Sequence, residues 1–174
     1  MSLDGAYDPD NIFAKIVRGE APCAKVFEDH DTMAFMDVFP QGRGHVLVVH
    51  KRAHARNLLD VEPEPLTAAI LTVQRVARAV RFALKPDGVF IAQFNGQVAG
   101  QTVYHLHFHV IPRWEGVALG RHGAGGMADM AELNQLAEAI ALEPGPDRGE
   151  PLALAFGEVG LRHGFGAPGS LLAG

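Results

Sequence analysis

The stretch VYHLHFHVIP, residues 103–112, places a histidine at every second position with apolar residues between them. Valine, tyrosine, phenylalanine and isoleucine favour an extended backbone, and strict alternation has the period of a strand. The spacing therefore predicts a strand with the histidines on one face, lining a surface or cleft, and the apolar residues packed in a core. The histidines are His105, His107 and His109, and the apolar residues are Leu106, Phe108 and Val110.

Working outward, alternating and helical patterns predict the remaining elements. Helices are expected at 11–19 and 63–84, and strands at 24–29, 32–38, 45–50 and 87–95, with Pro112 ending the histidine strand. In the long helix the inward face is expected to carry Leu66, Ile70, Val73, Ala77, Val80 and Leu84. The fold class is α+β: a mostly antiparallel five-stranded sheet, the last two strands adjacent, with a short N-terminal helix and one long helix.

The length of 174 residues favours one domain with appendages. Residues 1–10 are interpreted as a loose N-terminal leader and 11–115 as the domain. Residues 116–174 form a C-terminal accessory extension, partly helical, because 128–142 has helical spacing whereas 143–174 is rich in glycine and proline. Edge strands of so small a sheet need pairing, so a homodimer is expected.

Composition excludes several classes of partner. The net charge is −5 without a long basic run, so nucleic-acid binding is not expected. Cys23 is the single cysteine, which rules out an internal disulfide and a zinc site built from cysteines. No segment approaches the roughly 20 apolar residues of a membrane span, so we expect a cytoplasmic protein without membrane contact.

The histidines support more than one hypothesis. Neighbours on one strand face lie about 7 Å apart, so two of them and His45 could hold a metal ion, but no acidic residue accompanies the cluster, and no metal is expected. Half-exposed histidines without a function are a second alternative. The third is nucleophilic catalysis, since an uncharged imidazole with one defined free nitrogen is a good nucleophile. His107, with a neighbour on each side, is the candidate nucleophile.

The glycine-rich turn just before the histidine strand contains Gly100, Gln101 and Thr102. Glycine permits close backbone approach, while the amide and the hydroxyl are neutral groups suited to phosphoryl oxygens. Together with the histidine strand, this turn favours a phosphate-binding function.

At these residues the sequence resembles the histidine triad family, whose mark is His-φ-His-φ-His-φ-φ with φ apolar. The resemblance extends through NIFAKIVRGEAP, AFMD, GHVLVVHKRAH and FNGQVAGQTVYHLHFHVIPR, and so covers about residues 11–115. It implies cleavage or transfer of a purine nucleotide at the α-phosphorus through a nucleotidylated histidine. It also implies no cofactor, and a homodimer that pairs its sheets.

The resemblance also implies roles for individual residues. His107 would attack phosphorus, His109 would hydrogen-bond near the leaving group or phosphate, and His105 would orient His107, chiefly through its main-chain carbonyl. His45 matches a fourth histidine beside the triad. Gln101 and Thr102 would contact the phosphate or leaving group, Asn95 would lie at the phosphate end, Asp37 would accept both ribose hydroxyls, and Phe13, Ile16, Phe35 and Val38 would sandwich the purine.

Departures from the family pattern limit the resemblance. Bacterial relatives often hold a structural zinc with a Cys-x-x-Cys, but Asn11 and Ala14 occupy those positions, so that zinc site is expected to be absent and His54 is interpreted as a surface or helix-cap histidine. His109 argues against the transferase branch, which usually has glutamine there. Phosphoramidates and dinucleoside polyphosphates both remain possible substrates. A nucleotide-binding adaptor with little turnover is the alternative.

Overall fold

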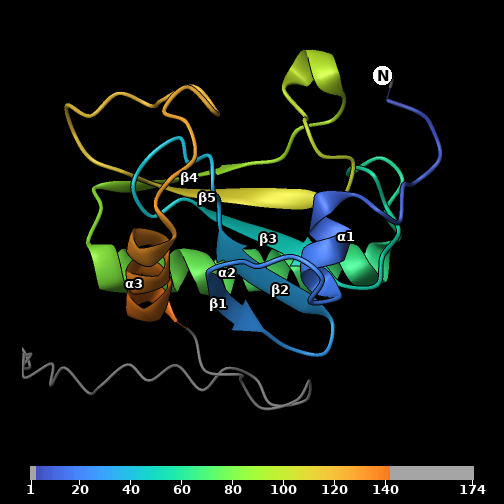
Figure 1. The fold of residues 1–174 in the computed structure, drawn as a ribbon, viewed down its shortest axis with the longest axis horizontal. Coiled ribbons are helices and arrows are strands. Elements are labelled where there is room, and N and C mark those ends of the chain that lie inside the picture. The colour runs from blue at the N-terminus through green and yellow to red at the C-terminus, as the bar shows by residue number, and fades with distance from the viewer. Residues whose placement is uncertain (1–2, 142–174) are drawn as a thin grey trace, which may run out of the picture. The chain divides into compact units, whose positions relative to one another are not determined.

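Strand pairing defines the architecture of the chain. The computed structural model describes residues 3–141. Five strands form one sheet in the order β1-β2-β3-β5-β4, and every neighbouring pair is antiparallel. The strands are β1 (Lys25–Glu28), β2 (Thr32–Met36), β3 (Val46–His50), β4 (Gly88–Ala92) and β5 (His107–Arg113). The predicted α+β fold is confirmed, including the adjacency of the last two strands (Figure 1).

The helices begin and end at local signals in the sequence. They are α1 (Ile12–Val17), α2 (Pro63–Leu84), the short 3₁₀ helix η1 (Gln97–Ala99) and α3 (Met130–Ile140). Asn11 caps α1 by accepting the Ala14 N–H at 3.0 Å. The predicted range of the long helix is confirmed: α2 starts at a proline and ends before Lys85, which has a φ of 48°. No helix within residues 3–141 has the length and apolar character needed to cross a bilayer.

The alternation within each strand separates two faces of the sheet. On one face Val46, Val48, Phe108 and Val110 pack with α2 and α3 in the larger core. On the other face Leu47 and Val49 belong to a smaller cluster with α1, and they lie opposite His109 and His107 of β5. In Figure 1 the long α2 passes behind the sheet while α1 lies in front of it. The three histidines therefore share the α1 side, as the alternation predicts.

Helix α3 joins the same core rather than forming a separate element. Its residues Leu133, Leu136 and Ile140 are buried, and all three belong to the cluster that includes α2. The prediction of a helix within 128–142 with these side chains inward is therefore confirmed. The rest of the C-terminal extension, 142–174, lies outside the described residues.

Two sequence-based expectations are wrong in detail. Ile70 was expected to face inward but is 44% exposed, because the face of α2 that meets the sheet is centred on Ala69, Val73, Val76 and Val80. Strand β5 also continues one residue past Pro112. The Arg113 carbonyl accepts the Asp87 N–H on the β4 side, so Pro112 faces the β3 side, where the ladder has already ended at Val110, and its missing N–H leaves no gap.

Candidate active site

A cavity of about 450 Å³ lies on the α1 side of the sheet. Its walls come from α1, from β2 and the loop after it, from β5, and from the loop between β5 and α3. The predicted site residues that line it are Phe13, Ile16, Phe35, Asp37, Val38, Thr102, His107 and His109. Of the other predicted residues, His45, His105 and Gln101 are buried behind this surface, and Asn95 is partly buried.

His107 presents one defined nitrogen to the cavity. Its Nδ1 lies 2.7 Å from the main-chain carbonyl oxygen of His105. A carbonyl can only accept, so Nδ1 carries the proton and Nε2 carries the lone pair in the uncharged ring. Burial lowers the pKa of His107, so the uncharged form is the one present at neutral pH. The resulting group is an imidazole with a free Nε2, as a nucleophile requires.

His105 is held through both of its ring nitrogens. Nε2 donates to the His50 carbonyl at 3.2 Å, and Nδ1 lies 2.7 Å from the Tyr7 hydroxyl. Because Nε2 is the donor, Nδ1 accepts the hydrogen bond from Tyr7. Burial lowers the pKa of His105 to about 4, so this ring is also uncharged at neutral pH.

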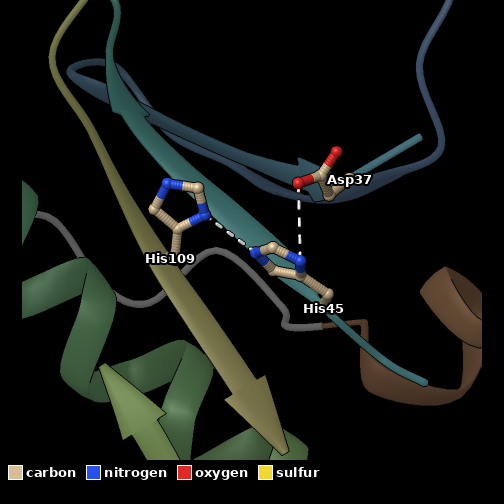
Figure 2. Close-up of side chains that lie close together, drawn as sticks. All are labelled: Asp37, His45 and His109. Carbon is tan, nitrogen blue, oxygen red and sulfur yellow. Dashed lines mark hydrogen bonds and ion pairs between the residues drawn. The ribbon is translucent and has the colours of Figure 1, made fainter. Parts of the chain in front are cut away.

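One hydrogen bond joins His45 to His109, as Figure 2 shows, and its direction is set by a bond from Gln41 to His45. The Gln41 N–H donates to Nδ1 of His45 at 3.2 Å, so the proton of His45 lies on Nε2, which donates to Nδ1 of His109 at 2.9 Å. The remaining proton of His109 must then lie on its Nε2. That atom is buried and has no hydrogen-bond partner among the described residues. A buried donor without a partner, in a residue that lines a cavity, suits a bound acceptor.

Asp37 directly follows β2 and lines the cavity. Its Oδ1 accepts the Phe39 N–H at 2.9 Å, which fixes the carboxylate. Its Oδ2 accepts from His122 Nε2 at 3.1 Å and lies 3.4 Å from His45 Nδ1. The carboxylate is therefore buried and oriented, with His122 at its outer side.

The group of Asp37, His45 and His109 bears on the metal-binding alternative. Asp37, His45 and His109 each offer a ligand atom, and these atoms lie within 4.8 Å of one another. An acidic residue therefore does accompany the cluster, contrary to the sequence-based expectation. However, both ring nitrogens of His45 and Nδ1 of His109 take part in hydrogen bonds within the protein. Uncharged imidazoles and a carboxylate are suitable zinc ligands. Here, however, hydrogen bonds already occupy three of the ring nitrogens that a metal ion would need.

The side chains of Gln101 and Asn95 form hydrogen bonds with main-chain groups around the site. The Gln101 amide donates to the carbonyls of Arg56 at 2.6 Å and Val103 at 3.1 Å, and its oxygen accepts the Gly96 N–H at 2.8 Å. Asn95 Oδ1 accepts the Leu58 N–H at 3.0 Å. Both side chains shape the loop before β5, whereas Thr102 is exposed and lines the cavity.

Apolar side chains make up the wall beside the candidate nucleophile. The Phe13 ring lies edge-on to Phe35 at 5.5 Å and to His107 at 4.9 Å, measured between ring centroids. Ile16 and Val38 complete the wall. These four predicted residues are therefore brought together, although Phe13, Ile16 and Phe35 also form the smaller core cluster.

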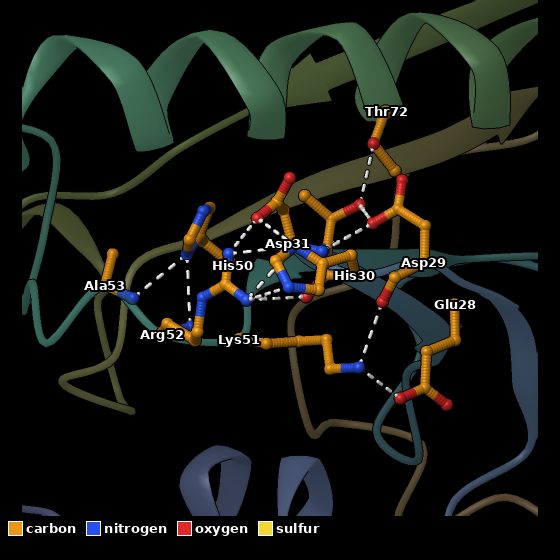
Figure 3. Close-up of polar contacts among 10 residues, drawn as sticks. Glu28, Asp29, His30, Asp31, His50, Lys51, Arg52, Ala53 and Thr72 are labelled. Atoms are coloured by element: carbon orange, nitrogen blue, oxygen red, sulfur yellow. Dashed lines mark hydrogen bonds and ion pairs between the residues drawn. The ribbon is translucent and has the colours of Figure 1, made fainter. Parts of the chain in front are cut away.

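A polar network fixes the segment that follows β3 (Figure 3). Nδ1 of His50 accepts the backbone N–H groups of Arg52 at 3.1 Å and Ala53 at 2.9 Å. The Arg52 guanidinium pairs with the Asp31 carboxylate on the turn between β1 and β2. This network holds the His50 carbonyl in the position where it accepts the proton of His105.

Sequence reasoning missed Tyr7 and His122. Tyr7 comes from the supposed loose leader, 98 residues before its partner His105, and His122 comes from the extension, 85 residues after Asp37. No short-range pattern marks either residue, because each contact depends on the fold. The leader is also attached elsewhere, since the Leu3 carbonyl accepts from the Asn57 side chain at 3.2 Å.

Comparisons with known proteins agree on one family. The protein-family model described as HIT domain matches residues 18–116. The crystal structure of a HIT-like protein from Bartonella henselae superposes with a TM-score of 0.72 at 47% identity, covering 78% of this chain and 97% of that one. The adenosine 5′-monophosphoramidase hnt1 of Schizosaccharomyces pombe is 37% identical over 102 residues, 59% of this chain and 73% of that protein. The adenylylsulfatase HINT3 of Arabidopsis thaliana is 34% identical over 119 residues, 65% of this chain and 60% of that protein.

Proposed function

The chain belongs to the HIT domain family, and from this premise we propose that it is a nucleotide hydrolase acting through a nucleotidyl-histidine intermediate. Its substrates are purine nucleoside phosphoramidates or dinucleoside polyphosphates, cleaved at the α-phosphorus. The observation that carries the proposal is the pair of His107 and His109, whose ring centroids are 4.9 Å apart at the cavity. One ring offers a lone pair and the other an unpartnered N–H, the combination needed for displacement at phosphorus.

The reaction proceeds in two displacements. Nε2 of His107 attacks the α-phosphorus and forms a P–N bond, while the bond from phosphorus to the leaving nitrogen or oxygen breaks with its electron pair on the leaving atom. The His109 Nε2–H donates a hydrogen bond toward that atom; a leaving phosphate departs as an anion, and a leaving amine takes a proton from solvent. Water then attacks the phosphorus and gives its proton to solvent. The P–N bond breaks, which returns the lone pair to His107 and releases a nucleoside monophosphate.

The rest of the cavity supports a nucleotide as the bound group. A buried, fixed carboxylate such as Asp37 can accept two hydrogen bonds from a diol, as the ribose of a nucleotide offers. The apolar wall around Phe13 and Phe35 suits an aromatic base. The relative from Schizosaccharomyces pombe is named as an adenosine 5′-monophosphoramidase, which agrees with this substrate class.

Trapping the intermediate tests the proposal. The protein is incubated with an adenosine phosphoramidate labelled at the phosphorus and then quenched in base, where a phosphohistidine persists. Label is expected on the wild-type protein and on His30→Asn, whose exposed ring lies outside the cavity, but not on His107→Asn. Equal labelling or equal turnover of His107→Asn contradicts the proposal.

The adaptor alternative makes a different prediction. Turnover of adenosine phosphoramidate and of diadenosine triphosphate is compared with the affinity for AMP. Tight AMP binding without turnover of either substrate identifies a binding protein rather than a hydrolase. The ratio of the two rates also shows which substrate class the enzyme prefers.

The homodimer also remains a proposal, supported by the free edge of the sheet. Strand β4 is one of the two edge strands, β1 being the other, and its consecutive residues Phe90 and Ile91 are 43% and 39% exposed. Consecutive strand residues point to opposite faces, so both faces of this edge are apolar. Unpaired apolar edges are pairing sites, and a second β4 can extend the sheet across a two-fold axis.

A further inference from the structure

We propose that Tyr7, in the N-terminal segment, is a positioning residue that fixes His105 and thereby keeps the reactive nitrogen of His107 free. The functional part of this inference rests on the function proposed above. The structural observation is the 2.7 Å contact between the Tyr7 hydroxyl and Nδ1 of His105. Tyr7 lies outside residues 18–116, the part of the chain that the family model matches.

The carbonyl oxygen of His105 lies 2.7 Å from Nδ1 of His107 and accepts its proton. Strand β5 begins only at His107, so the sheet ladder does not hold the His105 carbonyl. The Leu106 N–H, which belongs to the same peptide unit as this carbonyl, donates to the Ala55 carbonyl at 2.8 Å and restrains that unit on one side. The His105 side chain, attached at the Cα that ends this peptide unit, supplies a second restraint on the orientation of the carbonyl.

The His105 ring is fixed from two sides, and Tyr7 supplies one of them. The His50 carbonyl accepts the Nε2 proton, and the Tyr7 hydroxyl donates to Nδ1. Without that donor, Nδ1 is a buried acceptor with no partner, a costly state that a turn of the ring or an exchange of its proton can relieve. Either change disturbs the main chain of the same residue, and with it the carbonyl that directs the proton of His107.

Tyr7 is itself held in place. Its ring stacks on His54 with a centroid distance of 5.0 Å and an interplanar angle of 5°. The Leu3 carbonyl accepts from Asn57, which ties the start of the described segment to the domain. Burial raises the pKa of Tyr7, so its hydroxyl stays protonated and able to donate. His54, expected from the sequence to be a surface or helix-cap residue, is thus the platform for Tyr7.

Tyr7→Phe tests the inference because it removes the hydroxyl and keeps the stacked ring. We expect kcat to fall about 5-fold or more with KM nearly unchanged, since the defect concerns the nucleophile. The ¹⁵N shifts of His107 should move from those of a pure Nδ1–H form toward a mixture of the two tautomers. Tyr104→Phe is the matched control, because the buried Tyr104 hydroxyl has no partner among the described residues and the Arg56 guanidinium lies over the ring, not the hydroxyl.

A second variant keeps the test decisive. His54→Ala removes the stacking platform but leaves both partners of the hydrogen bond, and it should lower kcat and shift the His107 nitrogens in the same direction. The nitrogen shifts are recorded without substrate, so they judge this inference even if no proposed substrate is turned over. Wild-type nitrogen shifts in folded Tyr7→Phe, as judged by its melting temperature, overturn the inference.

Discussion

The ring of His107 is hydrogen-bonded to the main chain of His105, two residues earlier in the same segment. Nδ1–H of His107 donates to the His105 carbonyl at 2.7 Å. An alternating strand places the two side chains on one face, but it does not by itself turn one ring toward the other residue's carbonyl. The orientation arises because the segment leaves the ladder between them, since β5 begins at His107. The same bond defines which nitrogen is free.

Replacing His45 is expected to impair departure of the leaving group. His45→Leu removes the donor to Nδ1 of His109, so the His109 proton is no longer confined to Nε2. We expect kcat to fall about 10-fold or more for alkylamine leaving groups and much less for a nitrophenolate, which departs without assistance. His45→Gln, which retains an N–H donor, should give an intermediate loss. Equal losses for the two leaving groups would falsify this role.

Asp37→Asn is expected to weaken recognition of the sugar. An amide in place of the carboxylate offers fewer acceptors to a diol, so KM for adenosine phosphoramidate should rise about 10-fold. The 2′,3′-dideoxy analogue lacks both hydroxyls, and its KM should hardly change. His122→Ala, which removes the outer partner of the carboxylate, should have a smaller effect in the same direction. If Asp37→Asn raises KM equally for both substrates, the carboxylate does not read the ribose.

Stability is expected to fall as the pH is lowered from about 6.5 toward about 4. Burial lowers the pKa of His45 and of His105 to about 4 each, whereas an imidazole in the unfolded chain titrates near its ordinary value. In this window the unfolded chain binds more protons than the native protein, so the free energy of unfolding rises with pH. The effect is on the order of 3 kcal/mol for each ring over the full window.

Calorimetry at about pH 5 and about pH 7 checks this dependence. The melting temperature should be lower at the acidic pH, by a similar amount in His30→Gln, because the His30 ring is mostly exposed. A melting temperature that does not change across this interval is incompatible with uncharged buried imidazoles.

Charge on the free edge of the sheet is expected to separate the proposed dimer. Ile91→Lys places an ammonium group on β4, where a second copy would pair. Light scattering should show twice the mass of one chain for the wild type and a single mass for the variant. Leu59→Lys, at a position 69% exposed and outside β4, is the control and should remain dimeric. A monomeric wild type at micromolar concentration refutes the proposal.

The sequence predicted the elements whose residues carry a local period. Alternation located β5 and its two faces, and Pro63 marked the start of α2 because proline acts locally. The left-handed conformation of Lys85 at the end of the helix is seen only in the structure. Ile70 was misplaced because an apolar residue beside the buried stripe of a helix fits the same pattern as one within it. The pairing of β3 with β5, across α2 and β4, needed the structure or a known relative.

The candidate site also contains residues that the sequence predicted and residues that it could not predict. The histidine spacing identified the triad, and the resemblance supplied Asp37 and the apolar wall that the structure brings together. Tyr7 and His122 could not be found, because their partners are distant in sequence and neither segment has a periodic pattern. Gln101 was predicted to face phosphate, yet its side-chain amide already forms hydrogen bonds with three main-chain groups. The residue type alone does not reveal whether a glutamine binds a ligand or the main chain.

The position of β5 between β3 and β4 separates two parts of the proposed active site. Reactive imidazoles sit on an inner strand whose neighbours on both sides restrain it, whereas Tyr7 and His122 arrive from peripheral segments at either end of the described chain. Exchanging the outer segments would therefore change the groups that orient His105 and Asp37, while the strand that carries the reactive imidazoles stays in place.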